Sequence, residues 1–265
     1  MIRIPLLHLE GNLNSIAFWI GSIPIYWYAI LITTAILIFV LVARKRVEKF
    51  PFSYETVLDM LLVVLPVAFI GARLYYVIFS PVPYESLQEI MWVRDGGLAI
   101  YGGIIGGGLA LFLFCKAKKI EFLSMTDFIV PYLALGQAIG RWGNFMNVEA
   151  YGNMTQVPWR MEIRQNGNWI GVHPTFLYES ILDFGIFLLI TFLERKYRFS
   201  GFTTYCYLIL YSFARLWIEG LRSDSLLFFG VRISQIVSLF LCLIFCSILL
   251  KQIKKQKRKK GKAIN

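Results

Sequence analysis

Long apolar stretches separated by short polar segments run along most of the chain. Each is about as long as the roughly 20 mostly apolar residues that a helix needs to cross the hydrocarbon core of a bilayer. Glycine or polar residues interrupt the third and the fourth. The stretches lie at approximately residues 17–43, 54–79, 96–115, 124–143, 174–193, 201–220 and 228–250. The pattern predicts an all-α polytopic membrane protein with about seven transmembrane helices, forming a single integral membrane domain over residues 1–265.

The composition agrees with this prediction and argues against a soluble protein. Hydrophobic residues make up 57% and charged residues 16% of the 265, whereas soluble domains carry about 25% charged residues. The first stretch has no basic segment before it and no small-residue cleavage site after it. We therefore interpret it as a retained helix and not as a signal peptide.

Lysine is distributed unevenly among the connections, and this distribution predicts the topology. All 13 lysines fall after the first, third and fifth stretches or in the tail 251–265. The positive-inside rule places such segments in the cytoplasm, so the N-terminus is expected outside and the C-terminus inside. The net charge of +11 then reflects a basic cytoplasmic tail that contacts anionic lipid, and no nucleic-acid partner is expected.

Arginine, in contrast, also occurs near the ends of apolar stretches on the side expected to lie outside. Its planar guanidinium group stays charged when partly desolvated and binds phosphate or carboxylate through two hydrogen bonds. Ionisable groups within a bilayer are costly, so each suggests a function. The residues concerned are Arg73 near the end of the second stretch, Arg141, Asn144, Asn147 and Glu149 around the end of the fourth, and Arg215, Glu219 and Arg222 around the end of the sixth.

These residues allow two interpretations. Amides and charges at a membrane face can form a structural network in which every buried polar group is satisfied. Arg215 and Glu219 are four residues apart, so they can form an ion pair along one face of a helix. Several arginine-bearing stretches that meet at one level of the outer leaflet indicate instead a pocket for an anion.

The third stretch is unusually rich in glycine. Small residues four apart, such as Gly102 with Gly106 and Gly103 with Gly107, let helices approach closely, and close packing alone would explain them. The phosphate-binding pattern G-x-x-x-x-G-K-[ST] does not occur. Tyr101 lies within this segment, where its hydroxyl group is available to whatever occupies the space beside the glycines.

An extracytoplasmic insertion of about residues 144–173 is expected between the fourth and fifth stretches. Asn166-Gly167 is a turn signal between alternating segments and predicts a small β-hairpin. Pro174 is expected at the first position of the following helix, and we interpret the preceding His173 as structural. The four cysteines lie in or beside apolar stretches, so neither a disulfide bond nor a metal site is expected.

The segment GRWGNFMNVEAYG, residues 140–152, closely resembles the signature of bacterial prolipoprotein diacylglyceryl transferases. That signature is G-R-x-G-N-F-x-N-x-E-x-x-G, and every fixed position is met. Further segments resemble the family in the same order along nearly the whole chain. They are IYWYAI, GARLYYV, DGGLAIYGG, HPTFLYE and ARLWIEGLR.

The resemblance implies a multi-pass enzyme of the bacterial plasma membrane whose active site faces the outer leaflet. Such enzymes transfer the diacylglyceryl group from phosphatidylglycerol to the lipobox cysteine thiol of a prolipoprotein, the first step of lipoprotein maturation. They release glycerol 1-phosphate, and the nucleophile is the cysteine of the substrate. The resemblance implies neither a metal nor any other cofactor.

The resemblance also suggests roles for individual residues. Arg215 would oppose the charge that grows on the leaving phosphate, and Glu219 and Glu149 would orient guanidinium groups. The residues expected to bind phosphatidylglycerol are Arg141, Asn144, Asn147, Glu149, Gly152 and Arg73. The supporting residues are Arg222, His173, Gly102 and Gly103.

Two tyrosines complete the expected site. Tyr28 matches a functional tyrosine of the family. Tyr101 stands where better-known members have a histidine that has been proposed as the base. Because tyrosine with its ordinary pKa of about 10 is a poor base near neutral pH, Tyr101 is expected to donate a hydrogen bond, and the base remains open.

Two other functions would use the same residues. A lipid or anion transporter would bind phosphate with the same arginines but would need a path between the two membrane faces. A structural membrane scaffold would need the arginines for stability alone. The clustering of the polar stretches on the outer side favours the transferase.

Overall fold

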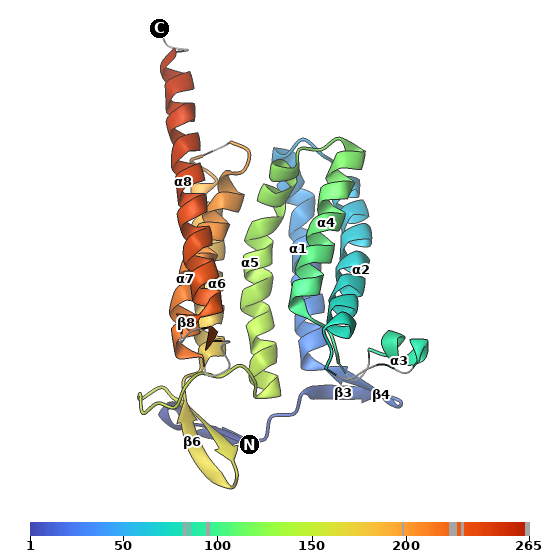
Figure 1. Ribbon diagram of the computed structural model, residues 1–265, viewed down its shortest axis with the longest axis vertical. Helices are drawn as coiled ribbons and strands as arrows, with labels where there is room; N and C mark the ends of the chain where they lie inside the picture. Colours follow the sequence, from blue (N-terminus) through green and yellow to red (C-terminus); the bar gives the residue numbers. More distant parts are fainter. Residues whose placement is uncertain are drawn as a thin grey trace. The chain divides into compact units, whose positions relative to one another are not determined.

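The computed structural model describes residues 1–81, 84, 86–93, 96–197, 199–222, 227–228 and 231–262. Among them are seven long helices and the single-turn helix α3 (Figure 1). The helices are α1 (Trp27–Arg46), α2 (Tyr54–Ile78), α3 (Leu87–Met91), α4 (Ile100–Lys118), α5 (Phe122–Asn147), α6 (Thr175–Leu193), α7 (Phe202–Leu221) and α8 (Ile233–Lys262). The chain divides into two compact units, which are Met1–Phe39 with Ile129–Asn265, and Val40–Phe128.

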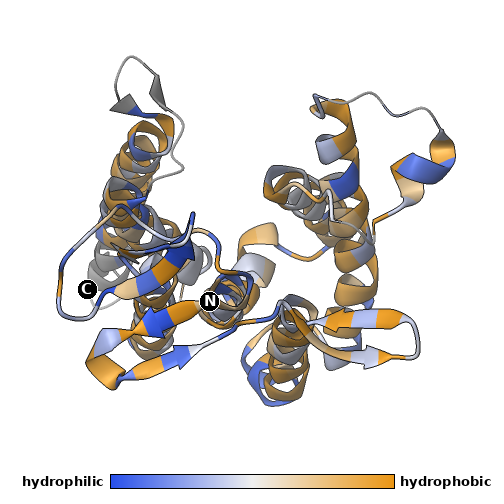
Figure 2. Cartoon of the chain, turned by 90° about the horizontal axis from the view of Figure 1, so that it is seen from below, coloured by the Kyte–Doolittle hydropathy of each residue, from blue (hydrophilic) through white to orange (hydrophobic). Residues whose placement is uncertain are grey.

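Six of the described helices are long and apolar enough to cross a membrane, namely α1, α2, α4, α5, α6 and α8. Helix α7 has 20 residues but is not among these six, because Arg215, Glu219 and several hydroxyl-bearing side chains interrupt its apolar sequence. The prediction of a mostly helical, multi-pass membrane protein is therefore confirmed. Viewed by hydropathy, apolar residues dominate the long helices (Figure 2).

The first helix begins later than expected. Residues 16–26 form a hairpin of β3 (Ile16–Ile20) and β4 (Ile23–Tyr26), and α1 starts only at Trp27. Ile20 pairs with Ile23 across a two-residue turn in which Gly21 has a φ of +59°, and such turns favour glycine. The predicted start near residue 17 was wrong because an apolar run does not by itself distinguish a strand from a helix.

A four-stranded antiparallel sheet, absent from the all-α prediction, lies in the first unit. Its order is β2-β1-β5-β6, and its strands are β1 (Ile2–Ile4), β2 (Leu9–Gly11), β5 (Met161–Gln165) and β6 (Asn168–Val172). The hairpin predicted at Asn166-Gly167 is confirmed, and both turn residues have the positive φ values, 50° and 85°, of a type I′ turn.

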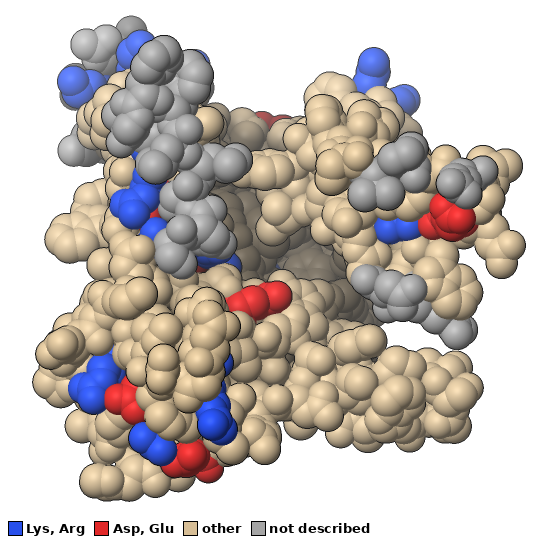
Figure 3. Space-filling model, turned by 60° about the horizontal axis from the view of Figure 1, so that its bottom comes forward, with Lys and Arg blue, Asp and Glu red and all other residues tan. Residues whose placement is uncertain are grey.

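The sheet closes over the start of α6 by burying apolar side chains on one face. Its core contains Ile2, Met161, Ile163 and Val172, together with Phe176 from the first turn of α6. Charged side chains gather on the surface over the sheet (Figure 3), where Arg3 pairs with Glu10 at 2.8 Å and Arg160 with Glu162 at 2.8 Å. The sheet thereby fixes the ends of the insertion that joins α5 to α6.

Glycines bring α2 and α4 close together in the second unit, so the predicted close approach of the glycine-rich helix to a neighbour is confirmed. A Cβ atom on Gly106 would lie 3.0 Å from the carbonyl oxygen of Val67 and 3.3 Å from the Cα atom of Gly71. A Cβ atom on Gly102 would overlap the carbonyl group of Gly71 and the side chain of Tyr75. The two helices therefore touch backbone to backbone along this face.

The boundaries of the insertion also differ from the prediction. Helix α5 continues to Asn147, so the insertion begins at Val148, where a φ of 54° ends the helix. Pro174 does not occupy the first helical position but precedes it, since α6 begins at Thr175. A short hairpin of β7 (Leu227–Phe228) and β8 (Val231–Arg232) leads into α8.

Candidate functional site

Three arginines from different parts of the first unit converge on the buried carboxylate of Glu179 in α6. Its Oε2 atom pairs with Arg141 of α5 and lies 3.3 Å from Nη1 of Arg215 in α7. Its Oε1 atom lies 3.3 Å from Nη1 of Arg222, just beyond the end of α7. The structure thus brings together the ends of two stretches that the sequence marked separately.

A second carboxylate completes this arginine–glutamate cluster, which we define as Arg141, Arg215, Arg222, Glu179 and Glu219. Nη2 of Arg215 lies 2.9 Å from Oε2 of Glu219, one turn further along α7. The two carboxylates are 6% and 4% exposed, and the three arginines 12–24%. Charges this far from water must be paired, and the arginines retain partial access to a ligand.

The end of α7 is shaped so that Arg222 reaches the cluster. Arg222 leaves the helix with extended backbone, and its carbonyl oxygen accepts a hydrogen bond of 3.1 Å from Arg232. A backbone bridge pairs Arg222 with Gly152. A Cβ atom on Gly152 would lie 2.6 Å from the carbonyl oxygen of Leu221 and 2.8 Å from the Cβ atom of His173. Gly152 therefore permits a close approach of three backbone segments beside the cluster.

The remaining polar residues of the signature form a separate network at the end of α5. Oε1 of Glu149 accepts hydrogen bonds from Nδ2 of Asn144 at 2.9 Å and of Asn147 at 3.2 Å. The carboxylate paired with Arg141 is that of Glu179. The expectation that Glu149 orients Arg141 is corrected accordingly: Glu149 orients the two amides, and Glu179 orients the guanidinium group.

Tyr28 lies against the same segment of α5. The space beside Gly143 is occupied by the Tyr28 ring, and a Cβ atom at Gly143 would overlap that ring. Gly143 stands between Arg141 and Asn144 in the signature. Because Gly143 has no side chain, the Tyr28 ring can pack directly against α5, the helix that carries Arg141, Asn144 and Asn147.

His173 belongs to a hydrogen-bonded group at the end of the insertion. Its Nδ1 atom lies 3.3 Å from the hydroxyl oxygen of Tyr178, which accepts a hydrogen bond of 2.8 Å from Nε1 of Trp159. Its backbone oxygen accepts a hydrogen bond of 2.9 Å from the Gly152 amide. These contacts agree with a structural role for His173, which stays a prediction.

The sequence reasoning missed the central role of Glu179 and the burial of Asp183. Both lie on α6, four residues apart, and Asp183 is 3% exposed with no hydrogen bond to its Oδ2 atom among the described residues. The available signal was a pair of carboxyl groups one turn apart inside an otherwise apolar stretch, which is costly in a bilayer and so indicates a function.

Helices α5 and α6 are tied together next to the cluster. The indole Nε1 of Trp142 donates to Oγ of Ser180 at 3.2 Å, and Ser180 in turn donates to the carbonyl oxygen of Ala138 at 2.8 Å. Trp142 follows Arg141, and Ser180 follows Glu179. The tie therefore fixes the relative positions of the paired arginine and glutamate.

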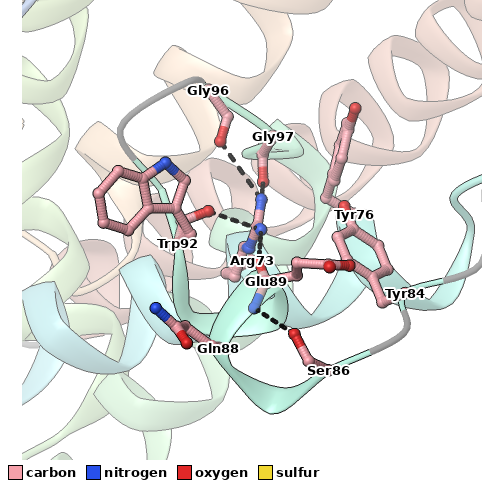
Figure 4. Close-up of a pocket in the computed structure, with 9 residues that line it drawn as sticks. All are labelled: Arg73, Tyr76, Tyr84, Ser86, Gln88, Glu89, Trp92, Gly96 and Gly97. Atoms are coloured by element: carbon pink, nitrogen blue, oxygen red, sulfur yellow. Dashed lines mark hydrogen bonds between the residues drawn. The ribbon is translucent and has the colours of Figure 1, made fainter.

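Arg73 lies in the second unit and has different partners from the cluster arginines. All five of its N–H donors are used by backbone carbonyl oxygens between residues 89 and 97, the shortest bonds being 2.7 Å to Ile90 and Trp92 (Figure 4). With no donor left over, this geometry does not favour the expected role in binding lipid phosphate. These hydrogen bonds indicate that Arg73 fixes the backbone of the segment that connects α2 to α4.

The same segment lines an open pocket of about 600 Å³. Its lining is drawn in Figure 4 and consists of Arg73, Tyr76, Tyr84, Ser86, Gln88, Glu89, Trp92, Gly96 and Gly97. Tyr101 belongs to this second unit as well, in the first turn of α4, where it is 64% exposed and its ring centre lies 6.2 Å from that of Tyr75. Gly102 and Gly103 follow it and face α2.

Comparison with known proteins identifies the family. Residues 15–251 match the family model described as prolipoprotein diacylglyceryl transferase. The phosphatidylglycerol–prolipoprotein diacylglyceryl transferase of Finegoldia magna is 46% identical over 93% of this chain and 97% of the relative. The protein of that name from Clostridioides difficile is 41% identical over 86% of this chain and 90% of the relative. The one from Clostridium perfringens, which carries the number 1 in its name, is 41% identical over 96% of this chain and 100% of the relative. The chain therefore belongs to the prolipoprotein diacylglyceryl transferase family.

Proposed function

We propose that this protein transfers the diacylglyceryl group of phosphatidylglycerol to the lipobox cysteine thiol of prolipoproteins, the first step of lipoprotein maturation. The observation that carries the proposal is the convergence of Arg141 and Arg215 on one position among apolar helices. Two guanidinium groups that share a single carboxylate oxygen are arranged to share a phosphate oxygen as well. The names of the relatives supply both substrates.

The reaction forms one bond and breaks another at the diacylglyceryl carbon bonded to the phosphate oxygen. The cysteine sulfur, which attacks as the thiolate, forms the thioether bond. The carbon–oxygen bond to phosphate breaks, its electron pair passes to the phosphate oxygen, and glycerol 1-phosphate leaves. The thiol proton is transferred to the departing phosphate or to a base, so charge and atoms balance.

In the first unit, different residues bind the lipid phosphate and stabilise the leaving group. Arg141 holds the phosphodiester, with the amides of Asn144 and Asn147 as neutral donors. Arg215 is held between two carboxylates, so its position is fixed before the reaction, and a preorganised cation stabilises charge that grows in the transition state. Tyr28, beside Gly143, completes the proposed site in this unit, and Tyr101 of the second unit stays a proposed hydrogen-bond donor.

We further propose that α7 is a seventh transmembrane helix. A lone arginine at the centre of a spanning helix costs about 2.5–3.5 kcal/mol on insertion scales. Arg215 does not bear this cost alone, because it pairs with Glu179 of α6 and with Glu219 of its own helix. With seven spans and the lysine-rich connections in the cytoplasm, the N-terminal strand, the insertion and the arginine–glutamate cluster lie on the outer side of the plasma membrane.

The decisive experiment uses purified protein in vesicles that contain phosphatidylglycerol with isotope-labelled acyl chains. A peptide with a lipobox cysteine is added, and its mass is measured with time. We expect a mass increase equal to one diacylglyceryl group, and none for the same peptide with serine in place of cysteine. Movement of labelled lipid between leaflets without any change in peptide mass would identify a transporter and refute the transferase.

A further inference from the structure

One face of α5 carries groups in the order in which they occur along a phospholipid. Positions three and four residues apart lie on the same face of a helix. From the apolar middle of α5 towards its end, this face carries Leu133, Gln137, Gly140, Arg141 and Asn144. Leu133 is 46% exposed, and the other four are partly buried. An apolar side chain, an amide, a glycine, a guanidinium group and a second amide thus follow one another.

The space beside Gly140 on this face is open. Outside the backbone of α5 itself, no heavy atom lies within 4 Å of the position that a Cβ atom on Gly140 would take. At Gly143, in contrast, the Tyr28 ring fills the corresponding space. Gly140 lies between Gln137 and Arg141 along the helix. The face therefore leaves room, next to the proposed phosphate ligand Arg141, for a group that does not belong to the protein.

The amide of Gln137 is held in place by a buried tyrosine. Tyr207 of α7 is 6% exposed, and its hydroxyl group donates a hydrogen bond of 2.9 Å to Oε1 of Gln137. This bond uses the acceptor end of the amide and fixes its orientation. The amide nitrogen Nε2 carries two N–H donors, and neither has a hydrogen-bond partner among the residues that the structure describes. Gln137 can therefore donate to an acceptor oxygen on a ligand.

The position of Gln137 relative to Arg141 matches the position of the ester groups of a phospholipid relative to its phosphate. Four residues of helix, about 6 Å, separate Gln137 from Arg141, and Gln137 lies on the side of the apolar part of α5. The ester groups of a phospholipid lie on the acyl-chain side of the phosphate. Only a few covalent bonds connect the two, so their separation is of the same order. A phosphate bound at Arg141 therefore places an ester carbonyl group beside Gln137 and the acyl chains beside Leu133.

We propose that Gln137 is a further lipid-binding residue, whose amide N–H groups donate to an ester carbonyl oxygen of the diacylglyceryl group. An ether-linked lipid lacks this carbonyl oxygen, so Gln137 makes the site selective for ester-linked lipid. The inference rests on the proposed function and adds a contact on the diacylglyceryl side of the phosphate. One neutral hydrogen bond corresponds to a preference of about three- to tenfold.

The test is a competition between two lipids in the same vesicles. One is phosphatidylglycerol with two ester-linked chains, and the other is its analogue with two ether-linked chains of the same length, in equal amounts. With either lipid, the cysteine sulfur of the lipobox peptide bonds to the glycerol carbon and the bond from that carbon to the phosphate oxygen breaks. The two peptide products differ in mass, so their ratio measures the preference independently of the amount of active protein. We expect the unaltered protein to prefer the ester-linked lipid by about three- to tenfold.

Gln137→Met keeps the length of the side chain and removes its N–H donors. We expect the product ratio to fall to about one, because transfer from the ester-linked lipid decreases while transfer from the ether-linked lipid does not. Gln235→Met is the matched control. Nε2 of Gln235 in α8 donates to the backbone oxygen of Leu216 at 3.0 Å, away from the proposed lipid face, so its product ratio should equal that of the unaltered protein.

A double variant covers the case in which Gln137→Met does not fold. The single substitution leaves the buried Tyr207 hydroxyl group without the partner that it has in Gln137, and an unsatisfied buried hydroxyl group is destabilising. Combining Gln137→Met with Tyr207→Phe removes both partners, which can be nearly neutral for stability. The same product ratio of about one is expected.

The outcomes separate this inference from the proposed function. An unaltered protein that leaves the peptide unmodified with both lipids refutes the transferase itself. An active unaltered protein without a preference for the ester-linked lipid refutes the inference alone. A Gln137→Met variant that keeps the preference, with both transfers unchanged or lowered equally, also refutes it and makes Gln137 only a structural partner of Tyr207.

Discussion

At the scale of single residues, the contacts of each arginine decide its role better than its place in the sequence. Arg141 and Arg215 share Oε2 of Glu179, whereas Arg73 has backbone carbonyl oxygens on all five donors. A guanidinium group bound to carboxylates in a partly open site can exchange one anion for another. One enclosed by carbonyl oxygens holds a backbone segment in place.

Arg141→Lys and Arg215→Lys are expected to fold but to lose at least about a hundredfold in transfer, the effect of removing one preorganised donor. Lysine keeps the charge but lacks the planar fork with which Arg215 reaches two carboxylates. Arg215→Lys should lower the maximal rate more than lipid affinity, while Arg141→Lys should lower both.

Single-turnover transfer and lipid affinity, measured on the same preparations, check this prediction. Arg160→Lys, just before β5 and paired with Glu162, is the control and should transfer normally. Rates equal to the unaltered protein in both cluster variants would mean that Arg141 and Arg215 are structural only.

His173→Gln is expected to retain most of the transferase activity. His173 lies in a hydrogen-bonded group with Tyr178 and Trp159, and its backbone contact with Gly152 does not depend on the side chain. Glutamine keeps a polar side chain at the position, so the insertion should remain ordered. Near-complete loss of transfer in a normally folded variant would instead favour His173 as the missing base.

At the scale of elements, the α2–α4 pair shows how small residues set the distance between helices. Gly102 of α4 touches the carbonyl group of Gly71 in α2, whereas nothing lies within 4 Å of the position of a Cβ atom on Gly108. The two glycines lie on different faces of one helix. They therefore allow the same substitution to be compared in a crowded and in an open environment.

Gly102→Ala is expected to lower the free energy of unfolding by roughly 1–3 kcal/mol, the usual cost of overpacking. Gly108→Ala should be neutral or stabilising, since alanine favours helix by about 1 kcal/mol over glycine. Thermal unfolding of the two variants in the same detergent measures the difference. Equal melting temperatures would contradict the close contact between α2 and α4.

At the scale of the whole molecule, the lysine distribution predicts where the two ends of the chain lie. A reporter that is active only outside the cell should be inactive when fused after Asn265, which lies beyond the described residues. The same reporter inserted at the exposed Asn166-Gly167 turn should be active. The opposite pattern of activities would overturn the proposed orientation.

The sequence alone determined the features that depend on local pattern. Apolar runs long enough to span a bilayer predicted the long helices, because a chain in lipid must satisfy its backbone groups within each segment. Asn166-Gly167 predicted its hairpin because both positions need positive φ. Glycines four apart predicted that the helix carrying them approaches a neighbour closely, and the structure shows that this neighbour is α2.

Tertiary structure alone decided which charges meet. Glu179 lies 30 or more residues from each of its arginine partners. The regular spacing of residues within a helix predicts contacts only between near neighbours in the sequence, so it cannot predict these ion pairs. The pairing of β1 with β5 and the enclosure of Arg73 by residues 89–97 are decided in the same way. Buried polar groups take whichever partners the fold brings within hydrogen-bonding distance, and that choice made Glu179, rather than Glu149, the carboxylate that holds Arg141.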